Sequence, residues 1–168
     1  CRGRAVQDRG GHVGPYETTL PRGGVVHATA NGGEGSAGEA GWAPAAESNG
    51  DIYVITSNGD WDGGANLGES FLRLSGTNLS VADWFTPDIY ASLSGSDLDL
   101  GSCGALLAPG SNGTHLVIAG GKDGMLYVLD RSQMGQVQSG NGPISKSVPA
   151  CDPKSPGNWQ SGHRTKTS

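Results

Sequence analysis

Short apolar runs alternate with glycine-rich polar turns through the middle of the chain, and they recur there twice in the same order. In the first copy, residues 42–46 are followed by an Asn-Gly turn and by an apolar run over residues 51–57. A long polar loop then leads to alternating runs at 70–75 and 79–85. Period-two alternation between turn signals is typical of β-strands. This segment is therefore expected to form a four-stranded antiparallel meander.

The second copy repeats the pattern with a shorter loop. Its runs cover residues 104–107, 115–120 and 125–130, and a weak fourth run covers residues 136–138. The Gly-rich turn at 120–124 replaces the long loop of the first copy, and residues 88–100 connect the two copies. A supersecondary unit that repeats in this way usually stacks on its neighbours, as the blades of a β-propeller do.

Composition fits many short strands better than helices. The 168 residues include 30 glycines, only 35% are hydrophobic, and 16% are charged. The glycines follow no three-residue period, which excludes collagen. No apolar run approaches the ~18 residues of a membrane helix, so no membrane span is expected. Since the chain starts without an initiator Met or a signal peptide, we expect a fragment or a processed product.

Charge and composition divide the chain into three parts. Residues 41–135 hold the two predicted blades, whereas 1–40 and 136–168 are expected to be irregular ends rich in Gly, Ser and Pro. Residues 23–131 carry 13 acidic and 3 basic side chains, and the two ends carry an excess of basic ones. Because the acidic middle would repel phosphate and no aromatic residues interleave with the basic ones, nucleic-acid binding is not expected.

The segment at 113–130, Gly-Thr-His-Leu-Val-Ile-Ala-Gly-Gly-Lys-Asp-Gly-Met-Leu-Tyr-Val-Leu-Asp, resembles the repeat of quinoprotein-like propellers, called the PQQ-like repeat. Residues 49–54 are similar to the strand of the same repeat, and 97–102 resemble its lead-in. The resemblance covers about residues 31–135. It implies a propeller of six to eight blades in complete proteins, usually exported to the periplasm or the extracellular space. Quinone dehydrogenases of this fold use a vicinal disulfide, which this sequence lacks, so no cofactor is expected.

Three groups of residues are candidates for specific chemistry. Asp60 and Asp62 could offer oxygen ligands to calcium, but the EF-hand spacing fails after Asp62 and a solvated turn is the favoured interpretation. Asp97 and Asp99 could face one side as paired carboxylates, although capping of turns is favoured over catalysis. No metal site is therefore assigned. A disulfide between the cysteines at positions 103 and 151 is conceivable in an oxidising compartment.

These observations predict an all-β chain that acts without catalysis, as a scaffold or interaction module whose rim loops bind a protein or a polymer. Trp42, Trp61 and Trp84 are expected to pack between blades or to anchor loops. The alternative is a piece of a quinoprotein-type oxidoreductase or a hydrolase whose active site lies on other blades. Two blades would leave apolar faces open, which predicts self-association.

Overall fold

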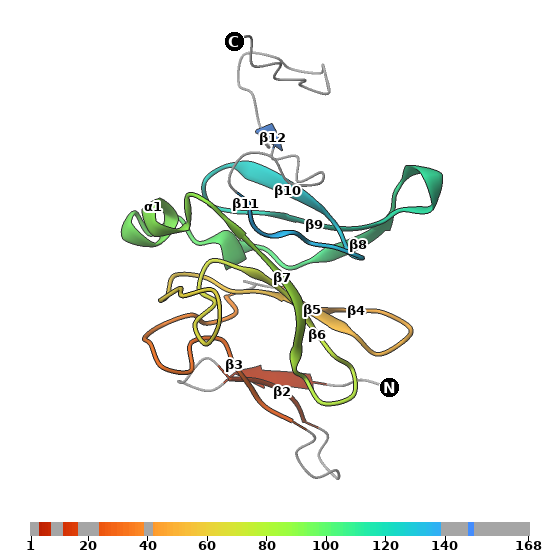
Figure 1. Cartoon of the computed structure of the whole chain (residues 1–168), viewed down its shortest axis with the longest axis horizontal. Coiled ribbons are helices and arrows are strands. Elements are labelled where there is room, and N and C mark those ends of the chain that lie inside the picture. Colours follow the sequence, from red (N-terminus) through yellow and green to blue (C-terminus); the bar gives the residue numbers. More distant parts are fainter. Residues whose placement is uncertain (1–3, 8–11, 17–23, 39–41, 139–147, 150–168) are drawn as a thin grey trace.

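The computed structural model describes residues 4–7, 12–16, 24–38, 42–138 and 148–149 (Figure 1). Within these ranges, antiparallel strands dominate and the one α-helix is short, which confirms the all-β prediction. The strands are β1 (Arg4–Gln7), β2 (His12–Tyr16), β3 (Val26–His27), β4 (Ala45–Ala46), β5 (Ile52–Ile55), β6 (Phe71–Leu74), β7 (Val81–Pro87), β8 (Leu106–Pro109), β9 (His115–Gly120), β10 (Met125–Asp130), β11 (Gln136–Gln138) and β12 (Val148–Pro149).

The first sheet has the strand order β11-β7-β6-β5-β4. Strands β4 to β7 form an antiparallel meander, as the alternating pattern predicts, with Tyr53 opposite Arg73 and Leu72 opposite Trp84. Strand β4 is shorter than the predicted run because only two of its residues pair with β5. Strand β11 adds to the other edge by pairing in parallel with β7.

The second sheet has the order β12-β10-β9-β8, and its predicted fourth strand lies elsewhere. Residues 136–138 do form a strand, but it joins the first sheet as β11 and not the second. The residues just before β11 explain this position. Met134 is almost completely buried in the core, and its backbone N–H donates to Asp83 Oδ2 of β7 at 2.9 Å. This contact directs the chain to the edge of β7.

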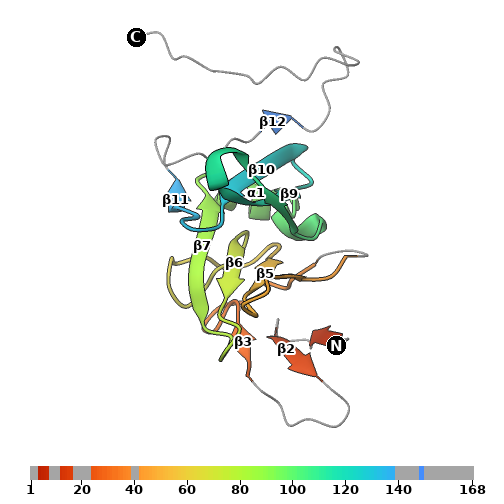
Figure 2. The same cartoon turned by 90° about the vertical axis from the view of Figure 1, so that its right-hand side faces the viewer.

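The two sheets pack face to face around one hydrophobic core (Figure 2). The first sheet contributes Tyr53, Ile55, Phe71 and Phe85 to it. The second sheet and its flanking segments contribute Leu100, Ala105, Val117, Ala119, Tyr127, Leu129 and Met134. The Tyr127 ring lies against both phenylalanines, with centroid distances of 6.0 Å to Phe71 and 6.2 Å to Phe85. This core is therefore formed only when the two sheets pack together.

The opposite face of the first sheet is also apolar and covered. Because side chains alternate along a strand, Val54, Leu72 and Leu74 point away from the second sheet and form a second cluster with Val26, Leu67 and Leu79. Val26 belongs to β3, which pairs with β2, and β2 pairs with β1. Strand β3 thus packs on this face of the first sheet through Val26, and β1 and β2 extend the sheet to which β3 belongs.

The connection between the sheets passes close to the backbone of β5. It contains α1 (Tyr90–Gly95) and a 3₁₀ turn, η1 (Leu100–Ser102), that contacts both β5 and β9. A Cβ on Gly101 would come within 2.7 Å of the carbonyl oxygen of Ile55. Glycine therefore permits the close approach of η1 to the first sheet. A second 3₁₀ turn, η2 (Ser111–Gly113), lies in the β8–β9 hairpin.

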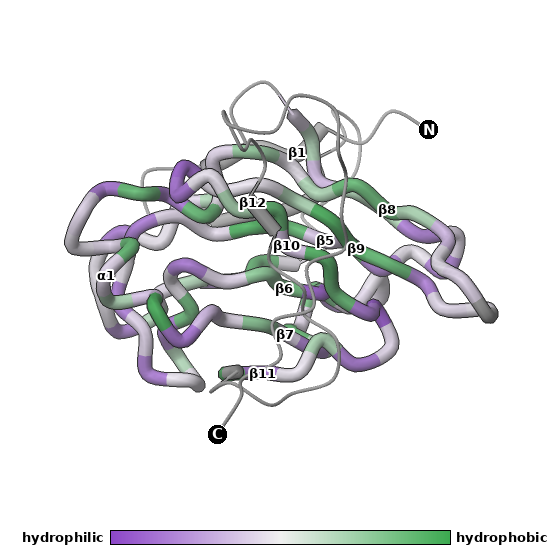
Figure 3. Tube along the Cα trace, turned by 90° about the horizontal axis from the view of Figure 1, so that it is seen from above, coloured by the Kyte–Doolittle hydropathy of each residue, from purple (hydrophilic) through white to green (hydrophobic). Residues whose placement is uncertain are grey.

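The strands of the second sheet are largely hydrophobic along the chain (Figure 3), and the residues that face away from the shared core are apolar as well. Leu106 on β8 lies opposite Ile118, and Ile118 lies opposite Val128. The Leu106 side chain is 56% exposed, and the other two are half-buried. A sheet that is apolar on both faces is suited to packing on both sides.

Among the described residues, none of the helical segments has the length and apolar character needed to cross a bilayer.

Candidate functional site

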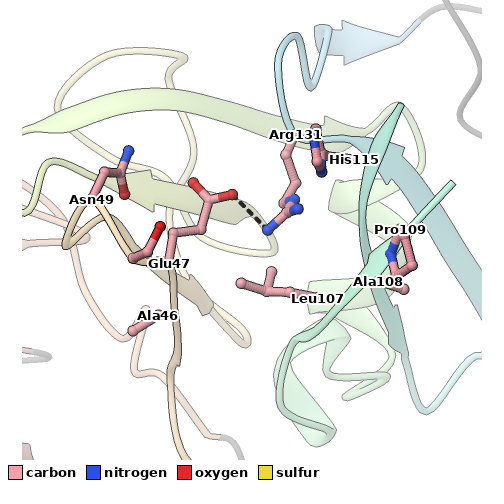
Figure 4. Close-up of a pocket in the computed structure, with 9 residues that line it drawn as sticks. Ala46, Glu47, Asn49, Leu107, Ala108, Pro109, His115 and Arg131 are labelled. Atoms are coloured by element: carbon pink, nitrogen blue, oxygen red, sulfur yellow. Dashed lines mark ion pairs between the residues drawn. The ribbon is translucent and has the colours of Figure 1, made fainter. Parts of the chain in front are cut away.

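A cavity of about 600 Å³ opens between the two sheets, at the end where their hairpin turns meet (Figure 4). The turn between β4 and β5 forms one wall, with Glu47 and Asn49. Strands β8 and β9 and the residue after β10 form the opposite wall. The lining residues are Ala46, Glu47, Ser48, Asn49, Leu107, Ala108, Pro109, His115 and Arg131. The cavity thus combines a charged pair, a histidine and a small apolar surface.

Arg131 is the central side chain of this cavity. It lies at the end of β10, and its backbone N–H donates to the His115 carbonyl oxygen at 2.8 Å. Its side chain is only 11% exposed, and Nη1 pairs with Glu47 Oε1 at 2.5 Å. The Nε atom is buried and has no hydrogen-bond partner. A guanidinium carries five N–H donors in a rigid fork, so Arg131 keeps donors for a further acceptor.

Glu47 is held in place by its own turn and by Tyr53. The backbone N–H of Glu47 donates to the Asp51 carbonyl at 2.9 Å, and Gly50 supplies the positive φ of 92° that the turn requires. The Tyr53 hydroxyl donates to Glu47 Oε2 at 3.3 Å. Burial, and next the charge of Glu47, raise the pKa of Tyr53 to about 12. Tyr53 therefore remains a neutral donor to the carboxylate at ordinary pH.

Two of the three cationic side chains between residues 23 and 131 meet near this cavity. Arg73 of β6 donates from Nη1 to the Arg131 carbonyl oxygen at 3.2 Å, and its Nε is also buried without a partner. Arg73 lies opposite Asp83 in the register of β6 and β7. Because the surrounding protein is acidic, a pair of arginines at one place is a local exception. Arg131 is the one of the two that lines the cavity, and its guanidinium suits an acceptor group such as a carboxylate.

A second group of charged residues lies at the other end of the same sheets, around Glu69. The Glu69 side chain is completely buried, and Oε2 accepts the N–H of Leu100 at 2.7 Å. Its Oε1 has no partner. Burial first, and then the nearby Asp99 and Asp123, raise the pKa of Glu69 to about 7, while the Leu100 hydrogen bond and Lys122 act against this.

The predicted pair Asp97 and Asp99 lies in this region, with Asp99 close enough to Glu69 to act on its charge. Lys122 forms ion pairs with both, and the closer one is to Asp99 Oδ2. Asn58 of the first unit donates from Nδ2 to Asp97 Oδ1 at 2.9 Å, and from its backbone to Asp99 at 3.4 Å. These contacts join the loop after β5 to the connection between the sheets. Both carboxylates thus accept hydrogen bonds and form ion pairs that hold neighbouring loops together.

The predicted calcium candidates, Asp60 and Asp62, order the long loop. Asp62 Oδ1 accepts the backbone N–H groups of Gly64 and Asn66, both at 2.9 Å. These backbone bonds lower the pKa of Asp62. Asp60 Oδ2 accepts the N–H of Gly33 at 2.9 Å, which joins the loop to an earlier turn. Among the residues that the structure describes, no three His, Cys, Asp or Glu side chains come together as ligands for one metal ion.

The structure places the predicted tryptophans and one of the two cysteines in different surroundings. Trp61 anchors the long loop, since its indole N–H donates to Thr86 Oγ1 at 3.0 Å and its ring lies against Trp84 and Tyr90. Trp42 is 63% exposed and packs less than the sequence predicts. Cys103 is half-buried, and the proposed partner at position 151 lies outside the described residues.

Sequence reasoning did not single out the residues that define the two sites. Glu47 and Glu69 belong to no motif, His115 lies in the repeat-like segment without a chemical role assigned to it, and Arg131 stands out only as one of three cations between residues 23 and 131. The scarcity of cations was the usable signal, because a rare arginine directly after an apolar strand calls for a buried or paired position. Comparison with protein-family models, curated proteins and solved structures finds no match to this chain.

Proposed function

We propose that the chain is a non-catalytic interaction module, built from two blades of a quinoprotein-like β-propeller, that binds a peptide segment of a partner protein in the cavity at Arg131. One observation carries this proposal: the cavity opens between the hairpin turns of two stacked sheets and is lined by a nearly buried arginine whose guanidinium has more N–H donors than its pair with Glu47 uses. Loops at one end of stacked sheets are where such scaffolds carry their binding residues. An exported location belongs to the same proposal and rests on the family resemblance alone.

Support for the blade arrangement comes from the way the sheets pack. Each contains an antiparallel series of strands in chain order, and the two share one core. The second sheet is apolar on its outer face too, as expected of a unit that has a neighbour on each side. The parallel strand β11 is an addition that the repeat pattern does not predict.

The lining of the cavity indicates which chemical group would bind. Arg131 offers N–H donors in the fork geometry that suits a carboxylate, and His115 lies beside it (Figure 4). Leu107 and Pro109 give an apolar surface, while Glu47 can accept from amide N–H groups. A carboxylate next to an aliphatic side chain, as at the C-terminus of a peptide that ends in leucine, fits all three features.

A short peptide that ends in a free leucine carboxylate is expected to bind the chain at least tenfold more tightly than the same peptide with an amidated end. The reason is that the amide cannot form the charge-assisted pair with Arg131. Calorimetric titration of both peptides measures this ratio. NMR shifts of the His115 side chain locate the binding.

Arg131→Lys keeps the charge and removes the fork, so it should abolish most of the preference for the carboxylate. Lys122→Gln is the matched control, because it removes a cation far from the cavity and should leave the ratio unchanged. Circular dichroism confirms that both variants fold. Equal affinity of the two peptides for the unmodified chain, or binding without a change at His115, would contradict the proposal.

A further inference from the structure

Glu69 lies at the junction between the first sheet and the connection that leads to the second sheet. It lies just before β6, with a positive φ of 48°, and its side chain reaches the connection between the sheets. Its carboxyl group accepts a hydrogen bond from the backbone N–H of Leu100, a residue of the shared core. Leu100 begins η1, which contacts β5 of the first sheet and β9 of the second. The Glu69 carboxyl group thus links the loop before β6 of the first sheet to η1, the segment that contacts both sheets.

The surroundings of Glu69 make its charge costly. It is buried with one oxygen unpaired, and Asp99 and Asp123 act on it with the same sign of charge. Lys122 is the cation that faces it, and this side chain is already paired with Asp99 and Asp97. Tyr127 of β10 donates to Asp123 Oδ2 at 2.6 Å and stays protonated, because burial raises its pKa. An uncompensated buried carboxylate is among the more costly groups in a protein interior.

We propose that Glu69 is a proton-controlled latch: the two sheets are held together most firmly when it is protonated, and the junction at η1 loosens when it ionises. In the neutral form the carboxyl group keeps an acceptor oxygen for Leu100 and carries no charge toward Asp99 and Asp123. In the ionised form the bond to Leu100 gains strength, but the repulsion and the lost hydration outweigh this gain, as the raised pKa indicates.

The latch is separate from the proposed binding function. The cavity lies at the β4–β5 and β8–β9 turns, whereas Glu69 lies in the loop between β5 and β6, at the other end of β5, where its backbone N–H donates to the Ser57 carbonyl oxygen at 3.0 Å. The hydrogen bond and the charges that act on Glu69 come from Leu100, Asp99, Asp123 and Lys122, and these four residues are not among those that line the cavity. The latch can therefore hold or fail without regard to whether a peptide binds at Arg131.

A pH titration of the unmodified chain by NMR tests the latch. The side-chain carboxyl carbon of Glu69 and the Leu100 amide are expected to shift together, with a midpoint near pH 7. In Glu69→Gln, which keeps the shape and an acceptor oxygen without the charge, the Leu100 shift should disappear. Asp97→Asn is the matched control: it removes an exposed charge from the same cluster and should leave a midpoint near pH 7.

Hydrogen exchange at Leu100, corrected for the intrinsic pH dependence, supplies the second measurement. It should be at least tenfold faster in the unmodified chain than in Glu69→Gln at pH 8, and equal in the two at pH 5.5. A Glu69 midpoint below pH 5 in the unmodified chain overturns the proposal even if the variant does not fold. Equal exchange rates at pH 8 would overturn it as well.

Discussion

Phe71→Ala is expected to destabilise both sheets at once, by about 3–5 kcal/mol, the usual cost of removing a buried phenylalanine ring. The Phe71 side chain is only 2% exposed, and its ring contacts Phe85 of its own sheet and Tyr127 of the second. The cavity left by the ring would remove contacts on both sides. Since small domains have only about 5–15 kcal/mol of stability in total, this variant should be close to unfolding at room temperature.

Urea unfolding followed separately in each sheet measures the effect. Amide signals of Val54 report on the first sheet and those of Val117 on the second, and both midpoints should fall together. Ile89→Ala provides the control, since this side chain is 47% exposed and its removal should change the free energy of unfolding by less than about 0.5 kcal/mol. If the second sheet kept its midpoint in Phe71→Ala, the two sheets would not share a core.

The second large effect concerns pH. The pKa of Glu69 rises from an ordinary value of 4.5 to about 7 on folding, so the unfolded chain releases this proton first as pH increases. The contribution of Glu69 to stability is complete below pH 4.5, declines between pH 4.5 and 7, and is lost above pH 7. A shift of this size corresponds to about 3 kcal/mol.

Comparing the unmodified chain with Glu69→Gln isolates this contribution. The other carboxylates titrate in both proteins, including Asp62 and Asp130, whose lowered pKa values act in the opposite direction, so their effects cancel in the difference. We expect the variant to gain about 3 kcal/mol on the unmodified chain between pH 4.5 and pH 8. Urea unfolding at a series of pH values measures the gap, and a gap that stays constant across this range would refute the assignment.

The sequence predicted the strands of both sheets well, because each is short, alternating and bounded by turn residues. The meander from β4 to β7 and the β8–β9–β10 series lie where residues such as Asn49-Gly50 and Asp123-Gly124 indicate turns. The position of β11 could not be predicted in this way. It depends on the burial of Met134 and on its bond to Asp83, 51 residues away, and a local pattern does not contain long-range contacts.

The two sites were harder to predict for the same reason. Glu47 and Arg131 are far apart in the chain and meet only because the two hairpin ends are stacked. Glu69 looks like an ordinary loop residue, and its burial follows from the approach of η1 to the first sheet. The sequence indicated Asp97 and Asp99 because they lie two positions apart and would share one face of an extended segment, and the structure adds Lys122 and Asn58 as their partners.

The central claim is that one core holds two sheets face to face, and proton–proton contacts between aromatic rings test it most directly. The Tyr127 ring centroid lies 6.0 Å from that of Phe71 and 6.2 Å from that of Phe85. Nuclear Overhauser effects measured on the chain in solution should therefore connect the ring protons of Tyr127 with those of both phenylalanines. Contacts between Phe71 and Phe85 without any contact to Tyr127 would show that the first sheet folds as described but does not pack on the second.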